Sequence, residues 1–421
     1  MPGITRDLGI DLGTTNTIFA EGTQILLQEP TMVAIVIDED KMVEWGQAAK
    51  NMEGRVPDSI EVVRPLRHGV IAEYEITETL LAYLTKKVCG PMRLFRPRMM
   101  ITVPYGVTSV EGRAVHEAGI GAGSREVYLV PQPLAAALGI DLPIGTPSGN
   151  MVISLGGGVN QIAIISLNGI VSGESARTGG IELDEAIVNY VRKRFGIIIG
   201  QPTAEHAKIT IGAAIPQDQQ LSLEVQGQDQ VTSLPRPVVL TTDDIVEAVQ
   251  EPLTDLVKII KKVLERTPPE LVSDIIDRGA AMCGGGSLLR GISDVLEEET
   301  NLRFRRYPLM LAEEGVEQWI ICLGTLHAVG AKKEARLDLL QTPTGARLRS
   351  GEIRWRPFMM PGIVAASALL ILLFSFIIGI VSEQNQLSAL QGQMQEIAKA
   401  IPGINPKQDP VKAARAICQN R

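Results

Sequence analysis

The chain has 421 residues, 45% of them hydrophobic and 21% charged, which is enough for two or three core-forming units and excludes a disordered chain. Its net charge of −8, with no basic stripe, argues against nucleic acid as a partner. The four cysteines show neither metal-ligand spacing nor a disulfide framework, which fits a reducing cytoplasm for the bulk of the chain.

The composition changes along the chain. Residues 1–335 alternate strand-like and helix-like patterns, which predicts an α/β fold. Residues 336–357 are polar and basic and contain Pro and Gly breakers, so they predict a linker. Residues 358–421 hold one long apolar run followed by a polar tail.

The first chemical signal is an apolar strand, a Gly/Thr/Asn turn and a second apolar strand near the N-terminus. Gly13 lets the backbone approach a phosphate without a Cβ clash. Thr14, Thr15 and Asn16 supply hydroxyl, amide and backbone donors for phosphate oxygens. Asp11, at the end of the first strand, is placed to hold Mg²⁺ through water. Taken alone, the same pattern also fits an ordinary hairpin.

The strand, glycine turn and strand return over Met151–Ile164. The glycines of this second turn are Gly156, Gly157 and Gly158. Two such hairpins indicate an internal duplication, with two domains closing on one nucleotide between facing loops. A third cluster precedes a helical pattern, and its bare backbone would let an adenine ring lie flat. It consists of Gly284, Gly285, Gly286 and Ser287.

These segments together resemble the actin superfamily and, within it, the MreB family of bacterial actins. The similarity runs from about Leu8 to Lys332 and includes several longer segments. Among them are Arg64-Pro65-Leu66-Arg67, Val103-Pro104-Tyr105-Gly106-Val107-Thr108 and Thr267-Pro268-Pro269-Glu270-Leu271. The resemblance implies an actin-like fold of two duplicated ribonuclease-H-like domains around a nucleotide cleft, with ATP and Mg²⁺ as ligands.

The resemblance also assigns domains and site residues. Residues 1–150 are expected to form domain I and residues 151–335 domain II, with the chain returning to domain I near 320–335. The first two glycine turns match the family's two phosphate loops, and the third matches its adenine loop. Glu205 and Lys208 match the pair that grips ribose and adenine, and they lie one helical turn apart. Outside the family context, this pair would be read as an ordinary surface ion pair.

Two departures from the family bear on catalysis. Gln132 stands where the family has a water-polarising Glu, and Ser154 stands where it has an Asp that helps hold the metal. Gln132 therefore occupies a catalytic position of the family. Its amide can orient a water but cannot accept the water's proton, which predicts slow hydrolysis. Ser154 removes a second negative charge near the metal. ATP is therefore expected to bind and to be hydrolysed slowly or not at all. His68 replaces the acid that the family usually has before Gly69, and the sequence does not explain this change.

Two segments predict membrane contact. Leu94 and Phe95 lie beside arginines at a loop position that touches membranes in the family, although they could also tuck into their own domain. The uncharged run 358–381 would span about 36 Å as a helix, enough to cross a bilayer, whereas a buried core helix is the alternative. Arginines precede this run and no Lys or Arg follows it in 382–397, which places the actin-like part in the cytoplasm.

The tail 382–421 is expected outside the cell. Leu387, Leu390 and Met394 begin an apolar seam at helical spacing, which fits either a short coiled coil or an amphipathic stub at the membrane surface. Cys418 is a lone thiol that could oxidise there.

The leading prediction is a membrane-anchored bacterial actin at the cytoplasmic membrane that forms head-to-tail filaments with itself and organises cell shape, envelope growth or a membrane compartment. A second MreB-like actin and envelope or morphogenesis proteins are the further partners considered. The alternative is a non-polymerising scaffold or adaptor of the FtsA or PilM kind. An active chaperone-type ATPase is disfavoured, because no substrate-binding domain follows residue 335.

Overall fold

The computed structural model describes residues 6–22, 24–39, 41–90, 96–307, 384–390, 392–393 and 396. The chain divides into two units, residues 1–350 and 351–421. The predicted spanning segment 358–381, the linker 336–357, the return near 320–335, and Leu94 and Phe95 lie outside the described residues. Among the residues that are described, no helix has both the length and the apolar character needed to cross a bilayer.

The first unit contains two five-stranded sheets with the same topology. In each, the first strand pairs antiparallel with the next strand and parallel with a later one. The first sheet has the order β10 (Glu126–Pro131), β9 (Arg98–Val103), β1 (Asp7–Leu12), β2 (Asn16–Glu21) and β3 (Gln24–Pro30). The second has the order β13 (Gly169–Ala176), β12 (Asn160–Ser166), β11 (Asn150–Leu155), β17 (Ala280–Cys283) and β18 (Phe304–Arg306).

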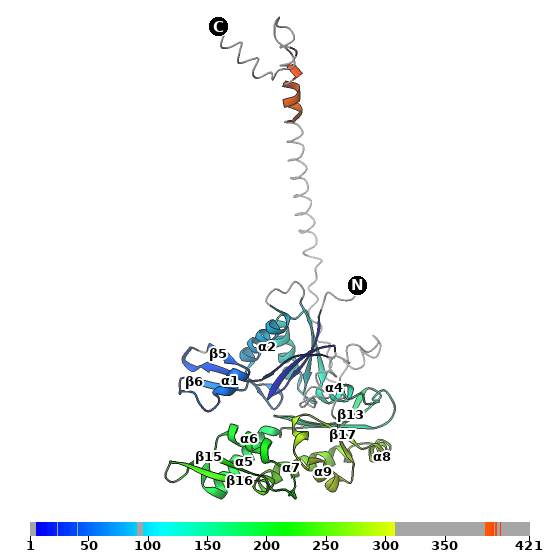
Figure 1. The fold of residues 1–421 in the computed structure, drawn as a ribbon. Helices are drawn as coiled ribbons and strands as arrows, with labels where there is room; N and C mark the ends of the chain where they lie inside the picture. The colour runs from blue at the N-terminus through cyan, green and yellow to red at the C-terminus, as the bar shows by residue number, and fades with distance from the viewer. Residues whose placement is uncertain are drawn as a thin grey trace. The chain divides into compact units, whose positions relative to one another are not determined.

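Each sheet is the centre of a lobe with its own helices and a smaller sheet (Figure 1). Lobe I, blue to cyan, adds β4 (Val33–Val36), η1 (Ile37–Glu39), β5 (Lys41–Trp45), α1 (Gln47–Met52), β6 (Ile60–Val63), the hairpin of β7 (Leu66–Arg67) and β8 (Val70–Ile71), α2 (Tyr74–Cys89) and α3 (Ser109–Gly121). Lobe II, green to yellow, adds α5 (Gly180–Phe195), β14 (Ile197–Ile198), α6 (Gln201–Ile211), β15 (Ser222–Asp229), β16 (Pro235–Thr241), α7 (Thr242–Glu265), α8 (Pro269–Arg278), η2 (Gly285–Leu288) and α9 (Ile292–Thr300).

A third core joins the lobes at α4 (Gln132–Gly139). Its Leu134 and the alanines that follow are buried against Val152 of β11 and Ala163 of β12. Ile153 and Ile162, one residue further along the same strands, belong instead to the core of lobe II. The alternation of side chains along a strand therefore buries β11 and β12 on both faces. This shared core makes α4 the place where the lobes are held together.

In the second unit, the described residues 384–390 are helical, and Leu387 and Leu390 are each 59% exposed. The helix expected at the start of the tail is therefore present, and its apolar residues are uncovered there. Met394 lies outside the described residues, so the full length of the predicted seam stays a prediction.

Candidate functional site

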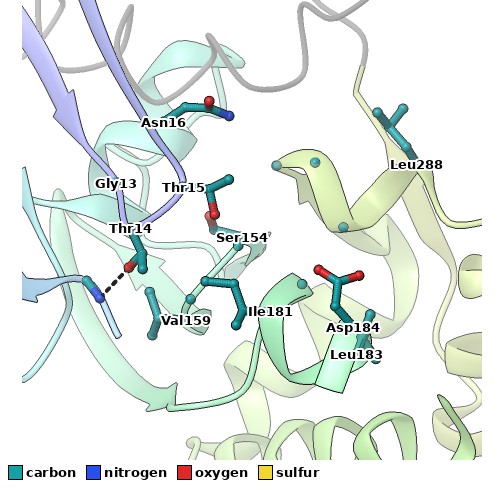
Figure 2. Close-up of a pocket in the computed structure, with 18 of the residues that line it drawn as sticks. Gly13, Thr14, Thr15, Asn16, Ser154, Val159, Ile181, Leu183, Asp184 and Leu288 are labelled. Atoms are coloured by element: carbon teal, nitrogen blue, oxygen red, sulfur yellow. Dashed lines mark hydrogen bonds between the residues drawn. The ribbon is translucent and has the colours of Figure 1, made fainter. Parts of the chain in front are cut away.

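A cavity of about 660 Å³ lies between the lobes, and both glycine turns line it (Figure 2). The residues predicted for the site that line the cavity are Asp11, Gly13, Thr14, Thr15, Asn16, Gln132, Gly156, Gly157, Gly158, Glu205, Lys208, Gly284, Gly285 and Gly286. Ser154 lines it as well. The structure thus brings together residues from five separate stretches of sequence.

The two phosphate-loop turns have the same internal geometry. The Gly13 N–H donates to the Asn16 carbonyl at 3.1 Å, and the Gly156 N–H donates to the Val159 carbonyl at 3.1 Å. A Cβ on Gly13 would lie 2.7 Å from the Asn16 oxygen, and one on Gly156 would lie 2.6 Å from the Val159 oxygen. Each turn therefore excludes a side chain at the same point, as expected for a duplicated hairpin.

The turns also face each other at close range. A Cβ on Gly157 would overlap the Thr15 hydroxyl at 1.7 Å, and one on Gly158 would lie 2.5 Å from Thr14 Oγ1. Thr14 is fixed by a hydrogen bond from the Gly69 N–H at 2.8 Å, drawn as the dashed line in Figure 2. Thr15 Oγ1 is buried without a hydrogen-bond partner in the described part of the chain. A narrow slot with a spare hydroxyl fits phosphate oxygens.

Asp11 projects from the opposite face of β1 to Ile10 and Leu12, which are in the core of lobe I. Its carboxylate accepts a hydrogen bond from Thr102 Oγ1 at 2.7 Å and one from Gln132 Nε2 at 3.4 Å. Burial raises the pKa of Asp11 to about 6, although both hydrogen bonds act to lower it. A bound cation would offset the cost of burying this charge.

Gln161 is a site residue that the sequence analysis missed. It is fully buried on β12, where it lies directly opposite Ser154 of β11. Its Nε2 donates to Gln132 Oε1, and its Oε1 accepts from the Tyr105 N–H at 2.7 Å. The available signal was an amide at Gln161, after Asn160 and before a run of apolar residues, in the strand that follows the second glycine turn. Gln161 thereby fixes the orientation of Gln132 from the other lobe.

Glu205 and Lys208 both line the cavity, but they form ion pairs with different partners. Lys208 Nζ lies 2.7 Å from Asp184 Oδ1 and donates to the Gly180 carbonyl at 2.7 Å. Glu205 pairs with Lys50 at 2.9 Å. Burial raises the pKa of Asp184 to about 6, while Lys208 lowers it. Asp184 therefore competes with any ligand for Lys208. The sequence had not indicated that Asp184 belongs to the site.

The third glycine cluster closes another side of the cavity. Gly284 has a φ of +86°, and its Cβ would lie 2.5 Å from the Leu155 carbonyl, so only glycine fits there. Ser287, which was predicted to contact the ligand, does not appear in the cavity lining. Its buried hydroxyl donates to the Gly284 carbonyl at 2.7 Å. Ser287 therefore shapes the turn, because its hydroxyl finds an acceptor three residues back.

Comparison with known proteins decides the family. The model of the "MreB/Mbl protein" family matches residues 5–328. The chain belongs to the MreB/Mbl family. MreB of Escherichia coli is 44% identical over 316 residues, covering 74% of this chain and 90% of that protein. Mbl of Bacillus subtilis is 40% identical over 321 residues, covering 76% of this chain and 94% of that protein. Both are described as cell shape-determining proteins.

Solved structures agree on the fold. MreB5 of Spiroplasma citri bound to AMPPNP superposes with a TM-score of 0.73 at 28% identity, covering 80% of this chain and 99% of that one. A MamK double helical filament gives a TM-score of 0.64 at 18% identity, covering 77% of this chain and 98% of that one. The predicted actin-like α/β fold is therefore confirmed.

Ser154 in this MreB/Mbl member lies on the cavity wall with 1% exposure. It pairs across the sheet with Cys283, whose pKa burial raises to about 12 in spite of a hydrogen bond with Ser154. Among the described residues, no group of three or more His, Cys, Asp or Glu side chains could hold a metal. One buried carboxylate, Asp11, fits a Mg²⁺ ion that keeps waters and nucleotide phosphates as its other ligands.

His68 has a contact that the sequence did not reveal. It occupies the turn between β7 and β8 with a φ of +49°. Its Nδ1 lies 3.1 Å from the Gly158 carbonyl and 3.3 Å from Glu182 Oε1. Both neighbours are acceptors, so a hydrogen bond from His68 to either of them uses the tautomer with the proton on Nδ1. The next residue, Gly69, holds Thr14, so this turn of lobe I contacts both phosphate loops.

Proposed function

We propose that this MreB/Mbl family member binds ATP with Mg²⁺ between its two glycine turns and assembles with itself into filaments at the cytoplasmic membrane. The observation that carries the proposal is the pair of facing turns, which leave no room for a Cβ at Gly157 or Gly158. MreB5 of Spiroplasma citri, solved with AMPPNP and with ADP, has the same fold. A role in cell shape, envelope growth or a membrane compartment is the function that these features support best.

The chain's own residues account for nucleotide binding and for weak hydrolysis. The N–H groups of both turns and the hydroxyl groups of Thr14 and Thr15 would hold the phosphates. Asp11 would hold Mg²⁺ through water, and the metal would neutralise charge on the phosphates. Gln132, fixed by Gln161, can orient a water at the cavity wall but cannot accept its proton. We infer slow turnover for this reason.

Restoring the two acids should restore hydrolysis. Gln132→Glu combined with Ser154→Asp is expected to raise the rate of phosphate release on the order of 10²-fold, because it adds a general base and a metal-side carboxylate. The new Glu would approach Asp11, whose Oδ1 lies 3.4 Å from Gln132 Nε2. Two carboxylates this close need a cation between them, so the gain should vanish when Mg²⁺ is removed.

A matched control separates charge from size. Gln132→Glu combined with Ser154→Asn places a side chain of the same shape at residue 154 without the charge. This pair should show a smaller gain than the pair with Asp. If the wild-type protein released phosphate as fast as either of these two double variants, the inference of weak hydrolysis would be refuted.

Membrane attachment through 358–381, aided by Leu94 and Phe95, is part of the proposal and rests on the sequence, with the tail outside the cell. Head-to-tail contacts are heterologous and so produce an open polymer. Every subunit of such a polymer would be tied to the bilayer. Polymerisation with a second MreB-like actin and recruitment of envelope proteins are compatible with this arrangement.

The full chain reconstituted into anionic lipid vesicles tests membrane attachment and assembly together. We expect it to float with the vesicles in high salt and to form membrane-bound filaments visible by electron microscopy when Mg²⁺ and ATP are added. Leu370→Arg combined with Leu373→Arg should abolish flotation, because each Arg costs roughly 2.5–3.5 kcal/mol at a helix centre. Vesicles that carry the protein but never filaments would instead support the adaptor function.

A further inference from the structure

At the rim of the cleft, a Lys–Glu ion pair joins the two lobes. The other contact of this kind between the lobes, among the described residues, is that of His68 with Glu182 at 3.3 Å. Lys50 of α1 in lobe I lies with its Nζ 2.9 Å from Glu205 Oε2 and 3.1 Å from Glu205 Oε1, and Glu205 belongs to α6 of lobe II. Every other Lys or Arg ion pair between described residues joins groups within one lobe. The pair is half-buried, since the side chains of Lys50 and Glu205 are 29% and 23% exposed.

The position of the pair means that opening of the cleft must break it. In Figure 1, α1 and α6 lie on the side of the cleft away from α4, where the shared core holds the lobes together. A cleft that opens about α4 must therefore separate Lys50 from Glu205. A nucleotide held between the phosphate loops leaves only when the cleft opens, so the strength of this pair bears directly on release.

The pair joins a residue of the cavity to one outside it. Glu205 lines the cavity, whereas Lys50 does not. Lys50 can therefore act on a bound nucleotide only through Glu205. Asp184 on the cavity wall interacts electrostatically with three other charged side chains of the lining, which are Glu205, Lys208 and Arg64. Lys208 forms an ion pair with Asp184, and Arg64 Nη2 lies 3.5 Å from Glu53. The cation that pairs with Glu205 is Lys50.

We propose that Lys50 is a positioning residue that retains ATP by fixing Glu205 and holding the two lobes closed at the rim of the cleft. This inference rests on the proposed nucleotide binding. According to this inference, a residue outside the cavity controls how long ATP stays bound. It also predicts that salt speeds ATP release, because screening weakens an ion pair that is partly accessible to solvent.

The test measures release of radiolabelled ATP from the full chain in detergent micelles with Mg²⁺, during a chase with excess unlabelled ATP. Lys50→Met, which keeps the aliphatic stem, should release ATP about three- to tenfold faster than wild type. Lys50→Arg should restore slow release. Added salt should speed release from wild type and have less effect on Lys50→Met.

Two comparisons make the result specific. Lys87→Met removes a pair of similar length with Glu29, 2.6 Å and wholly within lobe I, and should leave release unchanged. In a Glu205→Gln background, Lys50→Met should have no further effect if Lys50 acts through Glu205. Equal acceleration in both backgrounds, or none in wild type, would overturn the inference while leaving ATP binding intact. Failure of the wild-type chain to bind ATP would overturn the proposed function as well.

Discussion

Gly158→Ala is expected to reduce ATP affinity about 100-fold, which corresponds to roughly 2.8 kcal/mol of lost contacts between the nucleotide and the two loops. The new Cβ would lie 2.5 Å from Thr14 Oγ1, 2.6 Å from Thr14 Cβ and 2.7 Å from Thr14 Cγ2. Rotating Thr14 cannot relieve all three contacts, and Thr14 is held by the Gly69 N–H. The two phosphate loops must therefore separate.

Equilibrium binding of radiolabelled ATP to the full chain, with Mg²⁺ in excess, measures this loss. Gly145→Ala is the matched control, since its Cβ would meet only the Asn168 side chain at 3.6 Å, an ordinary contact. Thermal unfolding without nucleotide should show both variants folded. An affinity for Gly158→Ala within threefold of wild type would mean that the loops do not close on the nucleotide from both sides.

Asp11→Asn is expected to weaken Mg²⁺-dependent ATP binding and, in the absence of ligands, to stabilise the fold. Asp11 is 7% exposed, and burial raises its pKa to about 6. An unfolded Asp ionises near pH 3.9, so between these two values the folded state binds more protons and the free energy of unfolding falls as pH rises. The ionised, metal-free carboxylate then costs roughly 2–3 kcal/mol above pH 6.

The neutral amide of Asn removes this cost while it can still accept the hydrogen bond from Thr102. Thermal unfolding of the full chain in EDTA should therefore show a higher midpoint for Asp11→Asn than for wild type near pH 7.5. The difference should disappear near pH 4, where Asp11 is protonated. The exposed Asp218, changed to Asn, is the control for a general charge effect. Equal midpoints at both pH values would refute the buried-charge argument.

The site could be predicted wherever its chemistry is local in sequence. Gly13 and Gly156 were found because a tight turn forbids a Cβ whatever the rest of the fold does. Gln161 and Lys50 were missed, and His68 was noted without an explanation, because each of the three contacts a residue of the other lobe. A long-range contact leaves no periodic pattern in the chain, so only the structure brings these pairs together.

The fold, like the site, could be predicted where local patterns determine it and could not where contacts between distant residues do. Alternating strand-like and helix-like patterns and the repeated glycine turns predicted two α/β halves, and the two five-stranded sheets have the same topology. The alanines of α4 gave no sign that they pack against both lobes, since short side chains fit a buried helix of any location. The predicted role of Ser287 depended on the orientation of one hydroxyl, which local hydrogen bonding decides.

The matching geometry of the Gly13–Asn16 and Gly156–Val159 turns has a consequence for the ligand. Backbones of equal shape on two sides would accept a phosphate chain in either direction, but ATP has different ends. The direction would then be selected by what differs between the copies: Thr14, Thr15 and Asn16 in the first turn, against Gly157, Gly158 and Val159 in the second. On the proposed function, a few side chains would therefore set the orientation of the nucleotide, and the backbone of the two turns would not.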